Sequence, residues 1–423
     1  MRPRRLPRGV HGLVLAAAVV ALVAAGVFRF VYPPPTPSPI AFAARDIGHG
    51  YTYAYGATTA DFDRDGRLDI AASDSWFKSP APWGANLWIY WDGRDAQRIE
   101  HRQLFRFLKA PIFGLYLLER LVPIDIDRDG WTDIAAVVNS HGGVVAYRNP
   151  GRRGAEWAMT VLSDDVPGAV NLTRAEVDGD GDDDLFVSMR QPAGVTASAG
   201  VAWLENAGPG RWRRHAIDMT TQRRESRTLV AHDVDGDGRI DLLANDSVSG
   251  ALAWYGRRRD GGWTRHEIVG VDTRRTHYAG IGDVDGDGRG DIVTGDGGDL
   301  VWLRREGAGR WTRHRVARMP NWGPWHTQLV TEAVVTDIDR DGRADIAFTL
   351  ARLGKGTGSV RWARQLPSGG WQGHLVRPDW GQAVGLSAPD LDGDGRPDLL
   401  AVGEYGVQQV TAFMNRGPVQ SRQ

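Results

Sequence analysis

Residues 233–241 read Asp-Val-Asp-Gly-Asp-Gly-Arg-Ile-Asp, and this stretch decides how the rest of the chain is interpreted. Carboxylates stand at positions 1, 3, 5 and 9, and Gly238 at position 6 permits a sharp turn. Oxygen donors at this spacing surround one hard cation, which favours Ca²⁺ over softer metals. An EF-hand needs flanking helices and a Glu at position 12, where this chain has Ala244, so we expect a different calcium loop.

The same motif occurs seven times along the 423 residues. The gaps between successive starts are 64, 51, 57, 50, 54 and 53 residues. A period near 50 residues indicates a repeat architecture, so we interpret the chain as one closed repeat domain rather than two or three ordinary domains. The copies begin at Asp61, Asp125, Glu176, Asp233, Asp283, Asp337 and Asp390.

Each copy predicts four short strands. In the fourth copy an apolar strand at 229–231 leads into the motif and another at 242–244 leaves it, so the motif is a hairpin loop. A third strand at 251–255 and a fourth at 263–268 follow. Seven units of four strands predict an all-β fold, the seven-bladed β-propeller.

A tryptophan in the third strand and another nine residues later in the fourth recur in four units. A histidine follows three residues after each fourth-strand Trp, at His215, His266, His314 and His374. Equivalent positions on different blades lie far apart around a ring, so these histidines do not form one metal or catalytic cluster. We expect them to be structural, stacking on or bonding to the neighbouring strand.

The last unit lacks a fourth strand, and the beginning of the chain supplies a candidate. Phe42 lies 19 residues before Asp61, the same spacing as Trp371 before Asp390. We therefore expect residues 41–47 to pair with the last blade and close the ring, which removes open sheet edges. The propeller would then span residues 41–415, followed by a tail at 416–423.

Residues 1–32 have the order of an export signal: several arginines and then an apolar run from Gly12 to Phe28. They form either a cleaved signal peptide or an uncleaved single-pass signal anchor. Residues 33–40 are rich in proline and predict an extended linker. The propeller is therefore expected to be extracytoplasmic, either membrane-anchored through this segment or secreted.

Composition limits the chemistry. The chain has no cysteine, which excludes disulfides, thiol catalysis and Cys-ligated metals. The formal net charge is −1, and seven bound Ca²⁺ would change it to +13. Such a surface either attracts acidic polymers or anionic surfaces or simply carries scattered solvated arginines.

The repeated motif resembles the FG-GAP/VCBS repeats of the integrin α-subunit head and of many bacterial surface and secreted proteins, over about residues 41–415. The resemblance implies an integrin-like propeller in which each hairpin binds Ca²⁺, up to seven ions in all. Glu176 departs from the pattern by a longer side chain. The implied metal ligands are Asp61, Asp63, Asp65, the carbonyl of Arg67, and Asp69; Asp125, Asp127, Asp129 and Asp133; Glu176, Asp178, Asp180 and Asp184; Asp233, Asp235, Asp237 and Asp241; Asp283, Asp285, Asp287 and Asp291; Asp337, Asp339, Asp341 and Asp345; and Asp390, Asp392, Asp394 and Asp398.

These ions are expected to be structural. Several carboxylates within one loop oppose folding unless a cation lies between them. A catalytic metal would need an open coordination position beside a substrate pocket, which seven near-identical loops do not suggest.

Ligand-binding residues are expected on the face opposite the motif loops, where the loops between the second and third strands and the loops between successive units lie. Aromatic and basic side chains in those loops suit a sugar polymer, since rings stack on sugars and guanidinium groups bind carboxylates. The alternative is that the aromatics plug the channel or cover blade ends. The candidate residues are Trp76, Trp83, Arg274, His277, Trp322, Trp325, His326 and Trp380.

The leading functional hypothesis is an adhesion-like binding module for a protein or glycan partner. The chain contains no Gly-x-Ser-x-Gly, His-Glu-x-x-His or phosphate-binding glycine loop, so we name no catalytic residue. The alternative is a polysaccharide-active enzyme of the lyase or dehydratase type, for which His277 with Arg274, or His326, would supply a base. No basic stripe indicates nucleic-acid binding.

Overall fold

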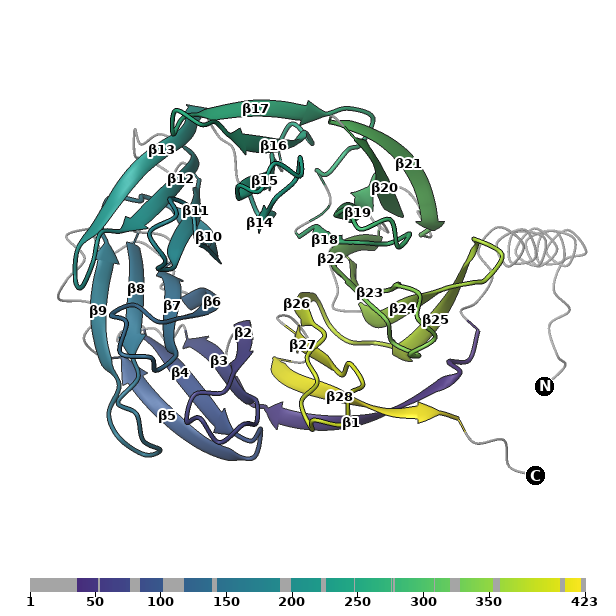
Figure 1. The fold of residues 1–423 in the computed structure, drawn as a ribbon. Coiled ribbons are helices and arrows are strands. Elements are labelled where there is room, and N and C mark those ends of the chain that lie inside the picture. The colour runs from purple at the N-terminus through teal and green to yellow at the C-terminus, as the bar shows by residue number, and fades with distance from the viewer. Residues whose placement is uncertain are drawn as a thin grey trace, which may run out of the picture.

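In the part of the chain that the computed structural model describes, 28 strands form seven four-stranded antiparallel sheets arranged as blades around a central axis (Figure 1). The predicted all-β seven-bladed propeller is therefore confirmed. Within each blade we call the innermost strand A and the outermost strand D. The described residues are 36–51, 54–76, 84–101, 118–138, 143–190, 199–221, 226–246, 248–274, 276, 278–307, 309–319, 328–352, 358–403 and 408–419.

The blades follow one another along the chain, each in the order A to D. The first four consist of β2 (Ala54–Ala60), β3 (Asp69–Trp76), β4 (Gly84–Trp91) and β5 (Asp95–His101); β6 (Leu118–Ile124), β7 (Asp133–Val138), β8 (Gly143–Arg148) and β9 (Ala158–Ser163); β10 (Ala169–Ala175), β11 (Asp184–Met189), β12 (Ala199–Asn206) and β13 (Trp212–Thr221); and β14 (Leu229–His232), β15 (Asp241–Asn245), β16 (Leu252–Arg257) and β17 (Trp263–Ile268). The last three consist of β18 (Gly280–Gly282), β19 (Asp291–Asp296), β20 (Asp299–Gly307) and β21 (Arg310–Ala317); β22 (Gln328–Thr336), β23 (Asp345–Arg352), β24 (Ser359–Gln365) and β25 (Trp371–Arg377); and β26 (Ala383–Ser387), β27 (Leu399–Gly403), β28 (Gln409–Pro418) and β1 (Ile40–Gly48).

Burial decreases from the inner part of each blade to its edge. Strand B is covered on both faces by neighbouring blades, and every residue of β7 and β11 is buried. Strand D is largely exposed, and only Ile268 of β17 is fully buried. The apolar core consequently lies between blades: each of the seven blade junctions holds its own cluster of buried side chains in the described residues.

The seventh blade combines both ends of the described chain. Residues 41–47 lie within β1, which runs antiparallel to β28 and pairs Phe42 with Asn415 and Arg45 with Ala412. Figure 1 shows β1 and β28 side by side at the ring closure. β28 extends to Pro418, three residues beyond the expected end of the domain. This pairing converts an open fan of blades into a closed ring.

Each of the four repeated histidines packs against the strand C tryptophan of its own blade, and three of them do so by ring stacking, as predicted. Ring centroids lie 4.4 Å apart for Trp203 and His215 and 4.1 Å apart for Trp254 and His266. The two remaining pairs, Trp302 with His314 and Trp362 with His374, both have centroids 4.7 Å apart. These aromatic pairs fill the outer part of the blades and are structural.

The described part of the proline-rich segment lies against blade six. The Thr36 N–H donates to the Gly373 carbonyl oxygen at 3.2 Å, and the Trp362 indole N–H donates to Ser38 Oγ at 3.2 Å. Hydrogen bonds therefore fasten the described part of the predicted linker to β24 and β25.

The predicted export signal or anchor at residues 1–32 lies outside the described residues. No helix in the described ranges has the length and apolar character required to cross a membrane.

Trp76 is the last residue of β3 and pairs with Gly84 of β4. The expectation that Trp76 lies in the loop after this strand is therefore wrong, because the strand extends to include it.

Candidate metal centres

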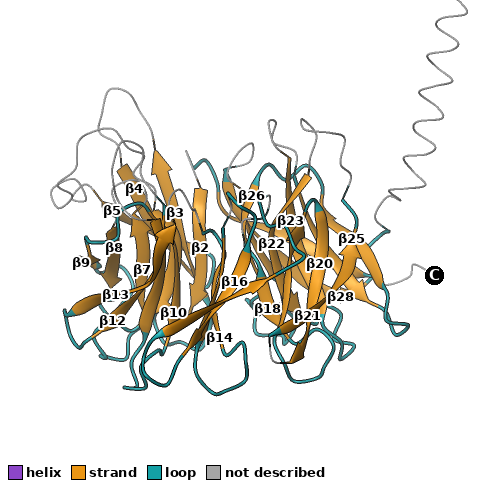
Figure 2. Cartoon of the chain, turned by 90° about the horizontal axis from the view of Figure 1, so that it is seen from above, coloured by secondary structure: helices purple, strands orange, loops and turns teal. Residues whose placement is uncertain are grey.

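The seven nine-residue motifs, here called the acidic loops, join strands A and B of every blade. In the fourth, β14 ends at His232 and β15 begins at Asp241. Because strands A point the same way in all blades, the acidic loops project from one face of the ring, the lower face in Figure 2. The motif therefore forms seven separate sites, one per blade.

The residue at position 1 organises each acidic loop. One of its carboxylate oxygens accepts the N–H of the position 6 glycine at 2.6–2.9 Å in all seven loops. Gly238 has φ +86°, a conformation that L residues with a Cβ rarely adopt. The predicted sharp turn is thus present, and it holds the position 1 carboxylate over the loop.

The aspartate at position 9 connects the acidic loop to the end of strand C. In loop six, Asp345 Oδ2 accepts the N–H of Ile338 at 3.0 Å, and its Oδ1 accepts the N–H of Gln365 at 2.9 Å. All seven loops repeat both bonds, at 2.9–3.2 Å and 2.6–2.9 Å respectively. Each position 9 side chain is almost completely buried, so this carboxylate is part of the blade as well as of the loop.

Burial raises the pKa of these position 9 carboxyls, and the backbone hydrogen bonds oppose the rise only in part. The pKa of Asp69, Asp241 and Asp398 rises to about 6, and that of Asp133, Asp184 and Asp345 to about 7. Burial also raises the pKa of Asp291. A cation beside these groups would favour their ionised form.

Carboxylate oxygens from positions 1, 3 and 9 converge in each of the first five loops, where one oxygen per residue lies within 4.8 Å of the others. These groups are Asp61, Asp63 and Asp69; Asp125, Asp127 and Asp133; Glu176, Asp178 and Asp184; Asp233, Asp235 and Asp241; and Asp283, Asp285 and Asp291. Asp125 Oδ1 and Asp339 Oδ1 are buried without a hydrogen-bond partner. An all-oxygen donor set with unsatisfied buried oxygens fits a hard divalent cation.

The longer Glu176 does not disrupt its loop. Its two carboxylate oxygens accept the N–H groups of Gly179 and Gly181 at 2.8 and 2.6 Å, as Asp233 does with Gly236 and Gly238. Glu176 also belongs to an oxygen cluster with Asp178 and Asp184. The third loop therefore has the same potential metal donors as the others.

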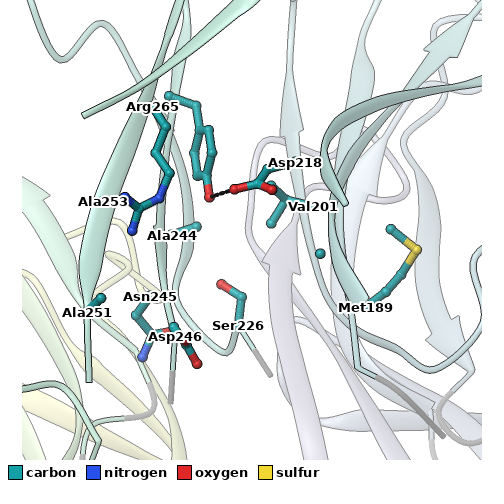
Figure 3. A pocket seen from close by; sticks show the side chains of 12 residues that line it. Met189, Val201, Asp218, Ser226, Ala244, Asn245, Asp246, Ala251, Ala253 and Arg265 are labelled. Carbon is teal, nitrogen blue, oxygen red and sulfur yellow. Dashed lines mark hydrogen bonds between the residues drawn. The ribbon is translucent and has the colours of Figure 1, made fainter. Parts of the chain in front are cut away.

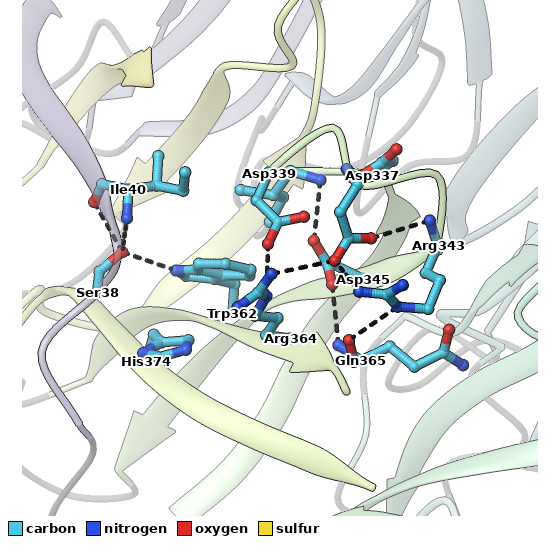
Figure 4. A network of polar contacts seen from close by, with 12 residues as sticks. Ser38, Ile40, Asp337, Asp339, Arg343, Asp345, Trp362, Arg364, Gln365 and His374 are labelled. Atoms are coloured by element: carbon cyan, nitrogen blue, oxygen red, sulfur yellow. Dashed lines mark hydrogen bonds and ion pairs between the residues drawn. The ribbon is translucent and has the colours of Figure 1, made fainter. Parts of the chain in front are cut away.

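Arginines surround the acidic loops, as Figure 4 shows for loop six. Arg364, near the end of strand C, pairs with Asp339 at 2.5 Å and with Asp341 at 3.1 Å. Arg304 occupies the equivalent position and pairs with Asp285 at 2.5 Å. These guanidinium groups therefore balance part of the carboxylate charge of the acidic loops.

The sequence analysis missed the conformation of position 4, which has positive φ in all seven loops. Four loops have glycine there, and the others have Arg64, Arg128 and Arg340 at φ 59–61°. Arg64 lies over the ring of Trp131 at 4.2 Å, and Arg128 pairs with Asp180 of the next loop at 3.4 Å. The glycine that recurs at position 4 was the sequence signal for this positive φ. Where arginine replaces it, contacts between neighbouring loops compensate the backbone strain.

The opposite face contains the residues expected to bind a ligand. Trp380 is only 1% exposed and packs edge-on against Phe413 at 5.5 Å, so its assignment to a ligand surface was wrong. Trp380 instead agrees with the alternative interpretation, in which the aromatic side chains cover the ends of the blades. Arg274 lies on an exposed turn and pairs with Asp272 at 2.5 Å. The other expected residues, Trp83, His277, Trp322, Trp325 and His326, lie outside the described residues.

A small polar pocket lies on this opposite face between blades three and four (Figure 3). Tyr255 donates its hydroxyl hydrogen to Asp218 Oδ2 at 2.9 Å, and Arg265, Ser226 and Asp246 also line the pocket. Its volume of about 20 Å³ accommodates one water molecule rather than a sugar ring. The sequence analysis did not select these residues, because they come from separate blades.

Comparisons with known proteins agree with this architecture. The model of the FG-GAP-like repeat matches residues 125–187, 177–244, 233–294, 283–348 and 337–401. A lectin from Agrocybe aegerita, described as recognising non-reducing terminal N-acetylglucosamine, has a TM-score of 0.50 and 16% identity, covering 78% of this chain and 88% of the lectin. A protein provisionally described as a gluconolactonase has a TM-score of 0.44 and 11% identity, over 93% of this chain and 97% of that chain. No curated protein matches the sequence.

Proposed function

This chain belongs to the FG-GAP-like repeat family, and from that premise we propose that it is a calcium-stabilised propeller that acts as a binding module for a protein or glycan partner. The module would function outside the cytoplasm, tethered through its N-terminal segment or secreted. The observation that carries this proposal is the distribution of the acidic loops: one similar site in every blade, built into the edge of the sheet.

Seven equivalent sites spread around a ring suit a structural role. Each position 9 carboxylate already bonds two backbone N–H groups of its own blade, so a cation held there would brace the hairpin against strand C. The ligands would be the acidic side chains at positions 1, 3 and 9 of each loop, with position 5 and the position 7 carbonyl as further donors. Calcium binding to the folded chain alone would add stability through mass action.

A braced ring presents the loops of its opposite face on a rigid support, and loops on rigid scaffolds commonly bind partners. The lectin that shares this fold recognises a terminal N-acetylglucosamine, which places glycans among the partners to test. The fold itself supports many functions, so the partner must be identified by experiment.

The test is a glycan array probed with the calcium-loaded protein, read beside an absorbance assay for unsaturated uronates. Retention of a glycan class without rising absorbance supports the binding module. Rising absorbance would contradict it and favour the polysaccharide-active enzyme. Equilibrium dialysis against Ca²⁺ tests the metal separately, and a protein that binds no Ca²⁺ would contradict the structural role of the loops.

A further inference from the structure

A cavity lies at the seam between the first and the seventh blade, on the same face as the acidic loops. Its volume is about 430 Å³, within the range of small-molecule sites. Blade one contributes residues 66–68 with Asp92 and Arg94, and blade seven contributes Arg45 and residues 390–393. The cavity therefore occurs where the two ends of the chain meet.

The seventh blade lacks the Trp–His pair that four of the blades hold between strands C and D. In four blades this register position holds a stacked Trp–His pair, such as Trp254 opposite His266. In blade seven, Ala412 stands opposite Arg45. Two large rings are thus replaced by a methyl group and a guanidinium group.

Arg45 extends across the seam to blade one. Its Nη2 donates to the carbonyl oxygens of Asp92 at 3.1 Å and Gly93 at 2.8 Å. Its Nε is buried and has no hydrogen-bond partner. The two carbonyl oxygens of blade one thus hold the Arg45 guanidinium group, and its positive charge, at the wall of the cavity.

Positive charge gathers in the same cavity. Arg67 and Arg94 line it together with Arg45, and Arg67 is 3.6 Å from the carboxylate of Asp92. Burial and the nearby charge of Arg94 lower the pKa of Arg45. The facing residues 390–393 belong to the seventh acidic loop, whose carboxylates would be engaged when that loop holds its cation. The cavity then presents three guanidinium groups to a ligand.

We propose that this seam pocket binds a carboxylate-bearing sugar, a hexuronate unit of an acidic glycan. Guanidinium groups form paired hydrogen bonds with carboxylates. The carboxylate of Asp92 and the backbone carbonyls beside it accept hydrogen bonds from sugar hydroxyls, a combination that a bare phosphate or sulfate would not use. The inference rests on the proposed binding function and specifies a ligand class and a place for it.

The experiment measures binding of sodium D-glucuronate to the calcium-loaded full chain by isothermal titration calorimetry, with glucose and sodium sulfate as comparison ligands. Glucuronate should bind, glucose should not, and sulfate should bind at least about tenfold more weakly. Arg94→Gln and Arg67→Gln should each weaken glucuronate binding about tenfold, the effect of losing one hydrogen bond to a charged group.

Arg259→Gln is the matched control, because this substitution removes the same charge. Arg259 is exposed in the turn between strands C and D of blade four, on the face that carries the acidic loops and the seam pocket. Equal affinity for sulfate and glucuronate would overturn the sugar assignment. Affinity unchanged in Arg94→Gln and Arg67→Gln, or reduced as much in Arg259→Gln, would overturn the site. If the wild type binds the glycan array and Arg94→Gln and Arg67→Gln bind it equally well, the seam pocket is rejected but the proposed function is not. If the wild type binds no partner at all, the proposed function is rejected.

Discussion

Replacing Asp345 with asparagine tests whether position 9 both braces the blade and binds the cation. Both carboxylate oxygens accept backbone N–H groups, from Ile338 and Gln365, and the side chain is fully buried. Asparagine has nearly the same shape but offers only one oxygen. Its NH₂ group would face a backbone N–H, so one buried donor loses its acceptor, and the site loses one negative ligand (Figure 4).

The two effects have separable magnitudes. An unsatisfied buried N–H costs about 2 kcal/mol of unfolding free energy, with or without metal. A site saturated at ~10 times its dissociation constant contributes ~1.4 kcal/mol, which the variant also loses when calcium is present. At pH 8 the Asp345 carboxyl, with its pKa of about 7, is mostly ionised. At that pH we expect Asp345→Asn to lose about 2 kcal/mol in EDTA and about 3.4 kcal/mol in calcium.

Urea denaturation in calcium and in EDTA gives both free energies, and equilibrium dialysis should show one fewer bound Ca²⁺ than the wild type. Asp260→Asn serves as the control, since Asp260 is exposed and its ion pair with Arg258 lies at the surface. Asparagine keeps an oxygen for the Gly262 N–H, so the predicted change is less than about 0.5 kcal/mol. Unchanged stability in EDTA would refute the bracing role of Asp345. Unchanged calcium stoichiometry would refute its role as a ligand.

Four further predictions concern the whole ring. EDTA at neutral pH should lower the melting temperature strongly, because seven sites together contribute on the order of 10 kcal/mol; an unchanged midpoint would contradict the calcium proposal. The position 9 pKa values of about 6 to 7 lie above the unfolded value. The folded metal-free protein therefore binds more protons, and its stability falls as pH rises from 5 to 8. Calorimetry should then show that calcium raises the melting temperature more at pH 8 than at pH 5; an equal rise at pH 5 and pH 8 would contradict this linkage. Deleting residues 41–47 should expose β28 and cause aggregation, detectable by light scattering, whereas a soluble variant that melts cooperatively would show that β1 is dispensable. Gly238→Ala should cost about 1 kcal/mol in urea denaturation because φ is +86°, and no loss would argue against that turn.

Local patterns predicted most of the architecture. The spacing of the acidic loops indicated seven blades, and alternating short strands around each loop indicated four strands per blade, as observed. The Trp–His pairs were also predictable, since partners on adjacent strands keep a constant separation in sequence. These features depend on residues within about one repeat of each other, so one sequence suffices to identify them.

The expected ligand face was less predictable. Trp380 looked like a loop aromatic, but the junction between blades six and seven buries it against Phe413. The seam pocket was not anticipated either, because Arg45 and Asp392 are separated by most of the chain. Whether an aromatic or an arginine faces solvent, a neighbouring blade or a cavity depends on packing between blades, which the repeat pattern leaves undefined.

The sequence by itself determined the repeated oxygen donors, the turn glycines and the number of blades, because hairpin geometry is local and each motif carries its own turn. Only the tertiary structure decided that the position 9 aspartates are buried with raised pKa values, since strand C of the same blade covers them. It also decided that ring closure places Arg45 across from Gly93. Burial and charge at the seam arise from contacts between blades, and such contacts exist only when the ring is closed.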